Sequence, residues 1–343
     1  MLDDLPVFGI GGLHGSGKTM VIEQLVPRLI AKGLKVVVVK HCAHRPDLDR
    51  PDKDSHKIFH SGADIFLDSA EEGVFRTHVT DDRDYSFTLE ELCSFYDLVI
   101  IEGGKSIPVK KVWLTAIDET APASVRGDVT VLLENSGIIV TIESIIDGWL
   151  PVQWMKPPVL GCVLIGGRSR RMGTPKHLLV HSGKTLLEHT VEHLNHVADT
   201  VVVVGNGEIP SGLSGIRRLE DIQGAGGPLA GILSAMRWAP HMTVLVAACD
   251  LADLSEGALE WLLSNRRPGV WAILPKLGGN SAVEPLLAHY DFRARSLLER
   301  LATVGSFSPS LIAGHPKVIT VSPPVRLRGA WKNFNTPGDI GLQ

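Results

Sequence analysis

The sequence predicts an α/β protein with two domains, and three observations support this. The chain has 343 residues, whereas single domains mostly run ~100–200 residues. Its composition, with 44% hydrophobic and 21% charged residues, is that of a globular protein. An apolar run, a glycine-rich turn and a helical segment follow one another twice, at 7–26 and at 159–173. This repetition favours two separate units with mostly parallel sheets.

The same composition excludes disordered, fibrous and disulfide-scaffold proteins. No apolar run approaches the ~18–20 residues that span a bilayer, and the acidic N-terminus does not resemble a signal peptide. The four cysteines (Cys42, Cys93, Cys162 and Cys249) form no Cys-x-x-Cys pair. Reduced thiols are therefore favoured over a disulfide or zinc framework, and we expect a cytoplasmic protein that does not contact a membrane.

Charge is distributed unevenly along the chain. Residues 1–155 carry 15 Lys and Arg against 24 Asp and Glu, a net charge of −9. Residues 156–343 carry 19 against 14, a net charge of +5. A basic second half suits an anionic ligand, and an acidic first half could dock onto it; ordinary variation between domains is the alternative. Neither half is basic enough to favour nucleic acid as the main partner.

A proline-rich stretch, WLPVQWMKPP at 149–158, separates the two parts of the sequence. Proline removes a backbone donor and restricts the residue before it, so we expect an irregular connector there. The predicted organisation is a first domain over 1–150, a linker over 151–158 and a second domain over 159–343.

Within each domain, apolar runs that suit buried strands alternate with helical segments. After the first strand, the first domain has predicted strands at Lys35–Lys40, Ala63–Leu67, Leu98–Glu102, Val109–Leu114 and Val129–Leu133, and helices near 19–32, 53–61 and 88–95. The second domain has predicted strands at 159–165, 200–204, 216–219, 243–248 and 270–274, and helices near 184–195, 228–237 and 255–264.

The glycine-rich turn of the first domain fits the pattern G-x-x-x-x-G-K-[ST] in full. Glycines let backbone N–H groups surround a phosphate chain, while the lysine reaches the terminal phosphates, the threonine hydroxyl binds Mg²⁺ and the next helix presents its positive end. A glycine-rich turn without a ligand is the alternative. The predicted phosphate site consists of Gly12, His14, Gly15, Ser16, Gly17, Lys18 and Thr19.

Two further features of the first domain carry polar chemistry. Asp97 precedes and Glu102 ends an apolar strand, and a carboxylate at such a strand end can organise a metal beside phosphates. We predict Glu102 and Thr19 as metal ligands, with Asp97 as a second candidate and surface acids as the alternative. The block Lys40-His-Cys-Ala-His44 follows another strand, where nucleotide or partner contact is favoured over a solvated loop or a metal site.

Together, the phosphate loop, the KHCAH block, the later Lys53-Asp-Ser and the strand end IEGGK resemble the MobB family over roughly residues 5–145. These proteins are GTP-binding adapters of molybdenum cofactor biosynthesis. The resemblance implies a P-loop NTPase-like α/β domain that binds GTP. One departure is Gly104, where a bulky residue such as Phe is expected.

The glycine turn of the second domain, LIGGRSRRMGTPK at 164–176, holds two adjacent glycines and several basic residues. Glycines allow a nucleotide to approach the backbone, while Arg171 and Lys176 can neutralise a triphosphate and a leaving pyrophosphate. A basic surface loop is the alternative.

Three later segments extend this second pattern. Asn206 follows a strand and can present a polar side chain to a base or ribose, and Asp221 precedes the tight turn Gly226–Gly231. Asp250 ends a buried strand, where a carboxylate suits Mg²⁺ beside phosphates. Each segment alone has a structural explanation, but in this order they predict one nucleotide site.

The second domain resembles the MobA family, the molybdenum cofactor guanylyltransferases, over roughly 157–343. The motifs are LIGGRSRRMGTPK, GGPLAGI, the Cys-Asp strand end, VEPLLAHY and KNFNTPGD. The resemblance implies a Rossmann-like nucleotidyltransferase α/β domain in which Asp250 holds Mg²⁺. Asn333 and Asn335 would face the pterin, with turn formation as the alternative. The implied GTP contacts are Leu164, Ile165, Gly166, Gly167, Lys176, Asn206, Asp221 and Asp250.

Both resemblances imply a fusion of a GTP-binding adapter with a guanylyltransferase that joins GMP from GTP to Mo-molybdopterin and releases pyrophosphate. Arg171, Lys176 and Asp250 are the implied catalytic residues, Mg²⁺ is the cofactor, and molybdoenzymes or other cofactor-biosynthesis proteins are further partners; a homodimer stays open. The alternatives are a cytidylyltransferase on the same pterin, a sugar-phosphate nucleotidyltransferase, and a GTP-dependent docking or chaperone protein whose transferase half is inactive.

Overall fold

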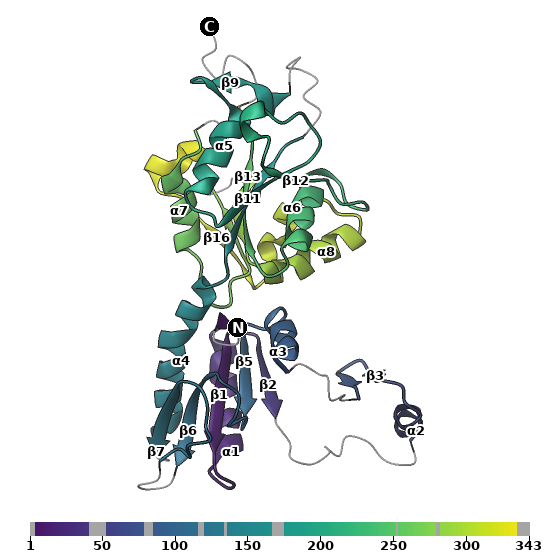
Figure 1. The fold of residues 1–343 in the computed structure, drawn as a ribbon, viewed down its shortest axis with the longest axis vertical. Helices are drawn as coiled ribbons and strands as arrows, with labels where there is room; N and C mark the ends of the chain where they lie inside the picture. The colour runs from purple at the N-terminus through teal and green to yellow at the C-terminus, as the bar shows by residue number, and fades with distance from the viewer. Residues whose placement is uncertain are drawn as a thin grey trace. The chain divides into compact units, whose positions relative to one another are not determined.

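The computed structural model describes most of the chain and divides it into two compact units. The described residues are 4–40, 53–78, 85–115, 120–133, 136–166, 175–251, 253–278 and 282–334. The first unit comprises Met1–Leu25, Val36–Cys93 and Leu98–Ile139, and the second comprises Val26–Lys35, Ser94–Asp97 and Val140–Gln343. Each unit is built around a twisted sheet with helices, as the two-domain α/β prediction requires (Figure 1).

The first unit has a parallel sheet of five strands in the order β2-β5-β1-β6-β7. The strands are β1 (Val7–Gly12), β2 (Val36–Lys40), β5 (Leu98–Glu102), β6 (Lys110–Thr115) and β7 (Val129–Leu133). The four strands predicted after β1 in this sheet are therefore confirmed. Because all five strands are parallel, the last residues of β1, β2 and β5 lie at the same edge of the sheet. These residues are Gly12, Lys40 and Glu102.

Three helices and a hairpin accompany this sheet. The helices are α1 (Lys18–Ala31), α2 (Asp54–His60) and α3 (Tyr85–Cys93), each close to its predicted range. The strand predicted at 63–67 is present as β3 (Ile65–Asp68), but it pairs antiparallel with the unpredicted β4 (Gly73–Arg76) outside the main sheet. The turn between them is short, and Ser69 stabilises it by accepting from the Glu72 N–H at 3.0 Å.

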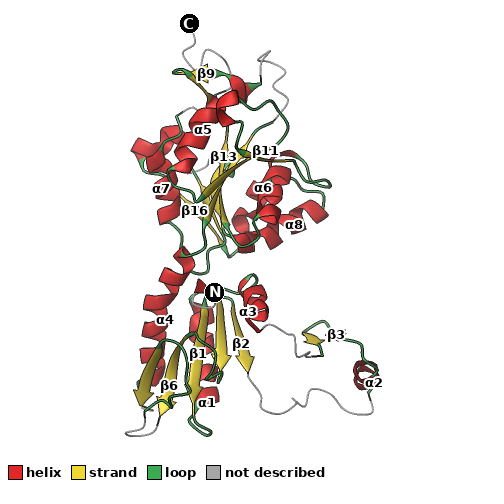
Figure 2. Cartoon of the chain, viewed as in Figure 1, coloured by secondary structure: helices red, strands yellow, loops and turns green. Residues whose placement is uncertain are grey.

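The irregular connector predicted over 151–158 is wrong over 151–155, where α4 (Ile138–Met155) continues as a helix (Figure 2). Pro151 removes only one intrahelical hydrogen bond, whereas Leu150 and Trp154 on either side of it are 2% and 3% exposed. Burial of these two side chains holds the helix together past the proline. Among the residues described, no helix is both long and apolar enough to cross a membrane.

The second unit has a sheet of seven strands in the order β12-β11-β8-β13-β15-β14-β16, parallel except at β15. Five of its strands were predicted: β8 (Val159–Leu164), β11 (Thr200–Val204), β12 (Arg217–Leu219), β13 (Thr243–Ala248) and β14 (Ala272–Pro275). The additional strands are β15 (Leu287–Tyr290) and β16 (Val318–Val321), with a small hairpin of β9 (Val180–His181) and β10 (Lys184–Thr185).

Helices cover both faces of this sheet (Figure 1). On one face α6 (Gly227–Trp238) and the unpredicted α8 (Arg295–Thr303) contribute to one apolar core. On the other face α5 (Leu186–Asn195) and α7 (Glu256–Ser264) contribute to a second core. The sheet is therefore buried on both faces, which explains its nearly continuous apolar strands.

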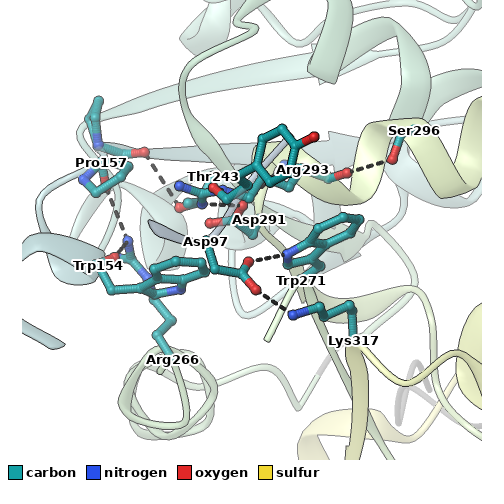
Figure 3. Close-up of polar contacts among 12 residues, drawn as sticks. Asp97, Trp154, Pro157, Thr243, Arg266, Trp271, Asp291, Arg293, Ser296 and Lys317 are labelled. Atoms are coloured by element: carbon teal, nitrogen blue, oxygen red, sulfur yellow. Dashed lines mark hydrogen bonds and ion pairs between the residues drawn. The ribbon is translucent and has the colours of Figure 1, made fainter. Parts of the chain in front are cut away.

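A group of buried polar side chains lies within the second unit (Figure 3). The Trp271 indole N–H donates to Asp97 Oδ1 at 2.7 Å, and Lys317 pairs with the other carboxylate oxygen. Arg266 donates to the carbonyls of Trp154 and Pro157, at 3.1 and 3.2 Å. These contacts provide hydrogen-bond partners for buried polar groups and for the carbonyls at the carboxyl end of α4. Their role is therefore structural.

Candidate nucleotide-binding sites

The phosphate loop predicted from the sequence lies between β1 and α1 in the first unit. Gly15 and Gly17 have φ angles of +79° and +70°, a left-handed conformation that favours glycine. The Lys18 ammonium lies across the loop and donates to the carbonyls of Leu13 and Gly12, at 2.6 and 3.1 Å. The loop, the lysine and the start of α1 therefore meet in the arrangement that binds phosphate.

The two predicted metal ligands of this unit lie side by side. The Thr19 hydroxyl donates to Glu102 Oε1 at 2.8 Å, and Lys40 lies 3.4 Å from the same carboxylate oxygen. Asp97, the other candidate, precedes β5, at the opposite end of the strand from Glu102, and is held by Trp271 and Lys317 within the second unit. A hydroxyl and a carboxylate are hard oxygen ligands that suit Mg²⁺ held beside phosphates.

A lysine that the sequence analysis did not assign organises the segment after Glu102. Lys111 is fully buried, and its ammonium donates to the carbonyls of Ile107 and Gly104, at 2.8 and 3.0 Å. Burial lowers the pKa of Lys111 to about 8. Gly104 has a φ of +59°, and a Cβ there would lie 2.8 Å from the Ile107 Cδ1. No bulky residue fits at position 104 in this conformation, which explains the departure noted in the sequence.

The polar block after β2 is only partly covered by the described residues. Lys40 ends β2, and Lys53 is the residue before α2, which contains Asp54 and Ser55. His41, Cys42 and His44 lie outside the described residues.

The second site lies where four parallel strands end. The last residue of β8, Leu164, accepts from the Cys249 N–H at 3.2 Å, and the Ile165 N–H donates to the Val204 carbonyl at 2.9 Å. Lys176, in a short 3₁₀ turn, pairs with Asp250 at 3.0 Å between Nζ and Oδ2. The two predicted catalytic residues that the structure describes are therefore in contact.

Asp221 and Asn206 lie at the neighbouring strand ends. Asp221 follows β12, and its Oδ1 is 3.3 Å from the position that a Cβ on Gly231 would occupy, with Leu164 packed at the same point. Partial burial raises the pKa of Asp221 above its ordinary value. Asn206 follows β11 and is exposed, and its Oδ1 accepts from Arg218 at 3.3 Å.

The predicted pterin contact Asn333 is exposed. It precedes Phe334, whose N–H donates to the Asp250 carbonyl at 3.0 Å, so the backbone at Asn333 lies next to the Lys176–Asp250 pair. Gly166 has a φ of +125°, and a Cβ on it would meet nothing within 4 Å. Gly167, Arg171 and Asn335 lie outside the described residues.

Three polar residues near this site were not assigned from the sequence. His177 follows Lys176, is buried, and its Nε2 donates to the Glu208 carbonyl at 2.9 Å. Arg218 contacts the segment that carries Asn206. Glu284 is the second residue of the motif VEPLLAHY, and burial raises its pKa. Of the three, Glu284 had a signal in the sequence, because it lies in the motif VEPLLAHY that carries the family resemblance.

The oxygen ligands available for a metal in the second site are few. Within the described residues no three His, Cys, Asp or Glu side chains are grouped as a metal site. Asp250 presents a carboxylate next to Lys176. This suits Mg²⁺, which commonly binds through one or two carboxylates together with substrate phosphates.

Two family models match this chain, one in each half. Residues 7–132 match the family "Molybdopterin guanine dinucleotide synthesis protein B". Residues 161–315 match the "MobA-like NTP transferase domain".

Curated relatives agree with both matches. The molybdopterin-guanine dinucleotide biosynthesis adapter protein of Haemophilus influenzae is 32% identical over 36% of this chain and 70% of its own length. A probable molybdenum cofactor guanylyltransferase of Rhodopirellula baltica is 32% identical over 54% of this chain and 91% of its own length.

Among solved structures, the crystal structure of molybdopterin-guanine dinucleotide biosynthesis protein A from Archaeoglobus fulgidus is 28% identical. It covers 53% of this chain and 95% of that chain, with a TM-score of 0.42. From the sequence matches, the chain belongs to the MobB family in its first part and to the MobA-like transferase family in its second part.

Proposed function

We propose that the protein is a molybdenum cofactor guanylyltransferase fused to a GTP-binding adapter. The transferase would join GMP from GTP to the phosphate of Mo-molybdopterin and release pyrophosphate. The observation that carries this proposal is the Lys176–Asp250 pair at the strand ends, flanked by Leu164–Gly166, Asn206 and Asp221. Membership of the MobA-like transferase family supports the same reaction.

In this reaction a phosphate oxygen of the pterin forms a bond to the α-phosphorus of GTP, while the bond from that phosphorus to the bridging oxygen of pyrophosphate breaks. The protein mainly positions the reactants and offsets charge on the phosphates. Lys176 supplies a cation at the site, and Arg171 is proposed as a second one. Asn206 is proposed to contact the nucleotide and Asn333 the pterin.

Mg²⁺ is proposed in both units. Asp250 would hold it in the second unit, and Thr19 with Glu102 in the first. When bound, the ion would offset negative charge on the phosphate oxygens.

The first unit is proposed to bind GTP at its phosphate loop and to assist synthesis or delivery of the product. The same proposal includes molybdoenzymes that receive the product, and a homodimer of this chain. It also includes a cytoplasmic location, in keeping with Cys93, Cys162 and Cys249, which are buried and form no disulfide among the described residues.

The test is pyrophosphate release by the full chain with Mo-molybdopterin and each of GTP, CTP and ATP. Release with GTP alone supports the proposal, whereas release with CTP alone would make the protein a cytidylyltransferase. Release only when a sugar phosphate replaces the pterin would assign a sugar-phosphate nucleotidyltransferase. Binding of GTP without release under any condition would favour a docking or chaperone protein.

The variant Asp250→Asn gives the first prediction about mechanism. It keeps the size of the side chain but removes the charge that holds the metal and pairs with Lys176. Because the metal acts mainly on charge that develops during transfer, turnover should fall by at least about 100-fold while GTP affinity changes less than about threefold. Single-turnover transfer and equilibrium binding measure the two quantities. Unchanged turnover at saturating Mg²⁺ would move the metal site to Asp221.

A further inference from the structure

The four residues after β11 form a turn, which we call the Asn206 loop (Gly205–Glu208). Gly205 has a φ of +117°, and a Cβ there would lie 1.9 Å from the Ile165 carbonyl oxygen. A Cβ on Gly207 would lie 2.7 Å from Cε1 of His177. Gly205 therefore packs against the backbone of Ile165, and Gly207 packs against the ring of His177. Neither glycine can gain a side chain without a shift of the loop.

His177 holds the far end of the Asn206 loop. Its ring is 4% exposed, and its Nε2 lies 2.9 Å from the Glu208 carbonyl oxygen. A carbonyl only accepts, so Nε2 carries the proton. Burial lowers the pKa of His177 and favours the neutral ring. Since His177 directly follows Lys176, the loop is tied to the Lys176–Asp250 pair.

Arg218, on the edge strand β12, holds the near end of the loop. Its Nε donates to the Gly205 carbonyl at 3.1 Å and its Nη2 to Asn206 Oδ1 at 3.3 Å. A guanidinium has donors only, so the amide oxygen of Asn206 must be the atom that faces Arg218. The two N–H donors of that amide then face away from Arg218, and the contact with the Gly205 carbonyl fixes the guanidinium against the backbone.

We propose that Arg218 is a positioning residue that sets base selectivity by fixing the Asn206 amide as a hydrogen-bond donor. The inference rests on the proposed function, which brings a nucleotide to this edge of the sheet. A fixed donor matches the O6 acceptor of a 6-oxopurine, whereas adenine presents an amino donor at that position. Two donors that face each other leave both polar groups unpaired, and this is how a site rejects the wrong base.

The experiment measures equilibrium binding of GTP, ITP and ATP to the full chain carrying Lys18→Ala, which silences the phosphate loop of the first unit. We expect GTP and ITP to bind with similar affinity and ATP at least tenfold more weakly, about 1.4 kcal/mol. Adding Arg218→Met frees the amide to rotate, so the three affinities should fall within about threefold. Arg218→Lys keeps the charge without the planar fork and should lose most of the preference.

The matched control is Arg217→Met, which removes the same charge from the adjacent position of β12 and should keep the preference for GTP over ATP. A preference that survives Arg218→Met would overturn the proposal, as would an equal loss in Arg217→Met or equal binding of ATP and GTP by the parent chain. If the preference for GTP is lost in Arg218→Met and kept in Arg217→Met, but the chain transfers no GMP, the proposed function is refuted and the role of Arg218 stays supported.

Discussion

Lys111 is a fully buried lysine whose ammonium donates to backbone carbonyl groups. Burial lowers its pKa to about 8, from 10.5 in an exposed lysine. The carbonyl acceptors favour the charged form and oppose this effect of burial. Lys111 joins β6 to the segment after Glu102, so it supports the backbone next to the Thr19–Glu102 contact.

This environment predicts a pH dependence of stability. Between pH 8 and 10.5 the unfolded chain binds more protons at Lys111 than the folded chain does, so the free energy of unfolding should rise with pH in that window. Below pH 8 the cost of burying the charge is fully present. Urea unfolding across this range should show a rise of about 1–3 kcal/mol in the native protein relative to Lys111→Met.

The control for that measurement is Lys110→Met, because Lys110 pairs with Asp128 nearer the surface. This variant should keep the rise in the free energy of unfolding. Parallel pH curves for the native protein and Lys111→Met would mean that the carbonyl acceptors fully compensate for burial.

The sequence predicted two pairs of candidate residues that the structure brings into contact, although their roles stay predictions. Thr19 with Glu102, and Lys176 with Asp250, meet because parallel strands end at one edge. His177 and Arg218 could not be predicted, since each acts on a backbone carbonyl whose position depends on the folded loop.

At the scale of elements, the strands buried within the regular β/α alternation were predicted, and those that break it were missed. β15 runs antiparallel between β13 and β14, and β16 follows a long irregular stretch. Neither has the apolar run plus helix that indicates a parallel unit. The helix α8 was also missed, although RSLLERLAT places its buried Leu297 and Leu298 on one face.

The helix α4 gives a prediction at this scale, because Pro151 is exposed on it and has no N–H to donate. Pro151→Ala restores that donor and removes the clash with the preceding turn, while the unfolded chain gains some freedom. We expect a net gain of about 1–2 kcal/mol in the free energy of unfolding, measured by urea or thermal unfolding. Val152→Ala, at the next exposed position, should change it by less than about 0.5 kcal/mol. A loss of stability in Pro151→Ala would instead show that the helix needs the bend that proline imposes.

At the scale of the whole molecule, the two proposed nucleotide sites lie on two separate sheets. The first uses a P-loop with the Thr19–Glu102 contact, and the second uses the Lys176–Asp250 pair. The two glycine turns follow different patterns, GLHGSGKT and LIGGRSRRMG. Apart from Asp97, which belongs to the second unit, the described residues named for each proposed site lie within a single unit.

This separation predicts that each site works when the other is disabled. Lys18→Ala should abolish nucleotide binding at the phosphate loop, because Lys18 is the cation that this pattern supplies to the phosphates. GMP transfer by the same full-length variant should stay within about twofold of the native rate, since the Lys176–Asp250 pair is untouched. Calorimetric titration with GTP would count the sites, and pyrophosphate release would give the rate. Asp250→Asn is the reciprocal variant, which should bind GTP at the phosphate loop as the native protein does and yet transfer little GMP. A loss of transfer beyond tenfold in Lys18→Ala, about 1.4 kcal/mol, would mean that GTP in the first unit controls the chemistry of the second.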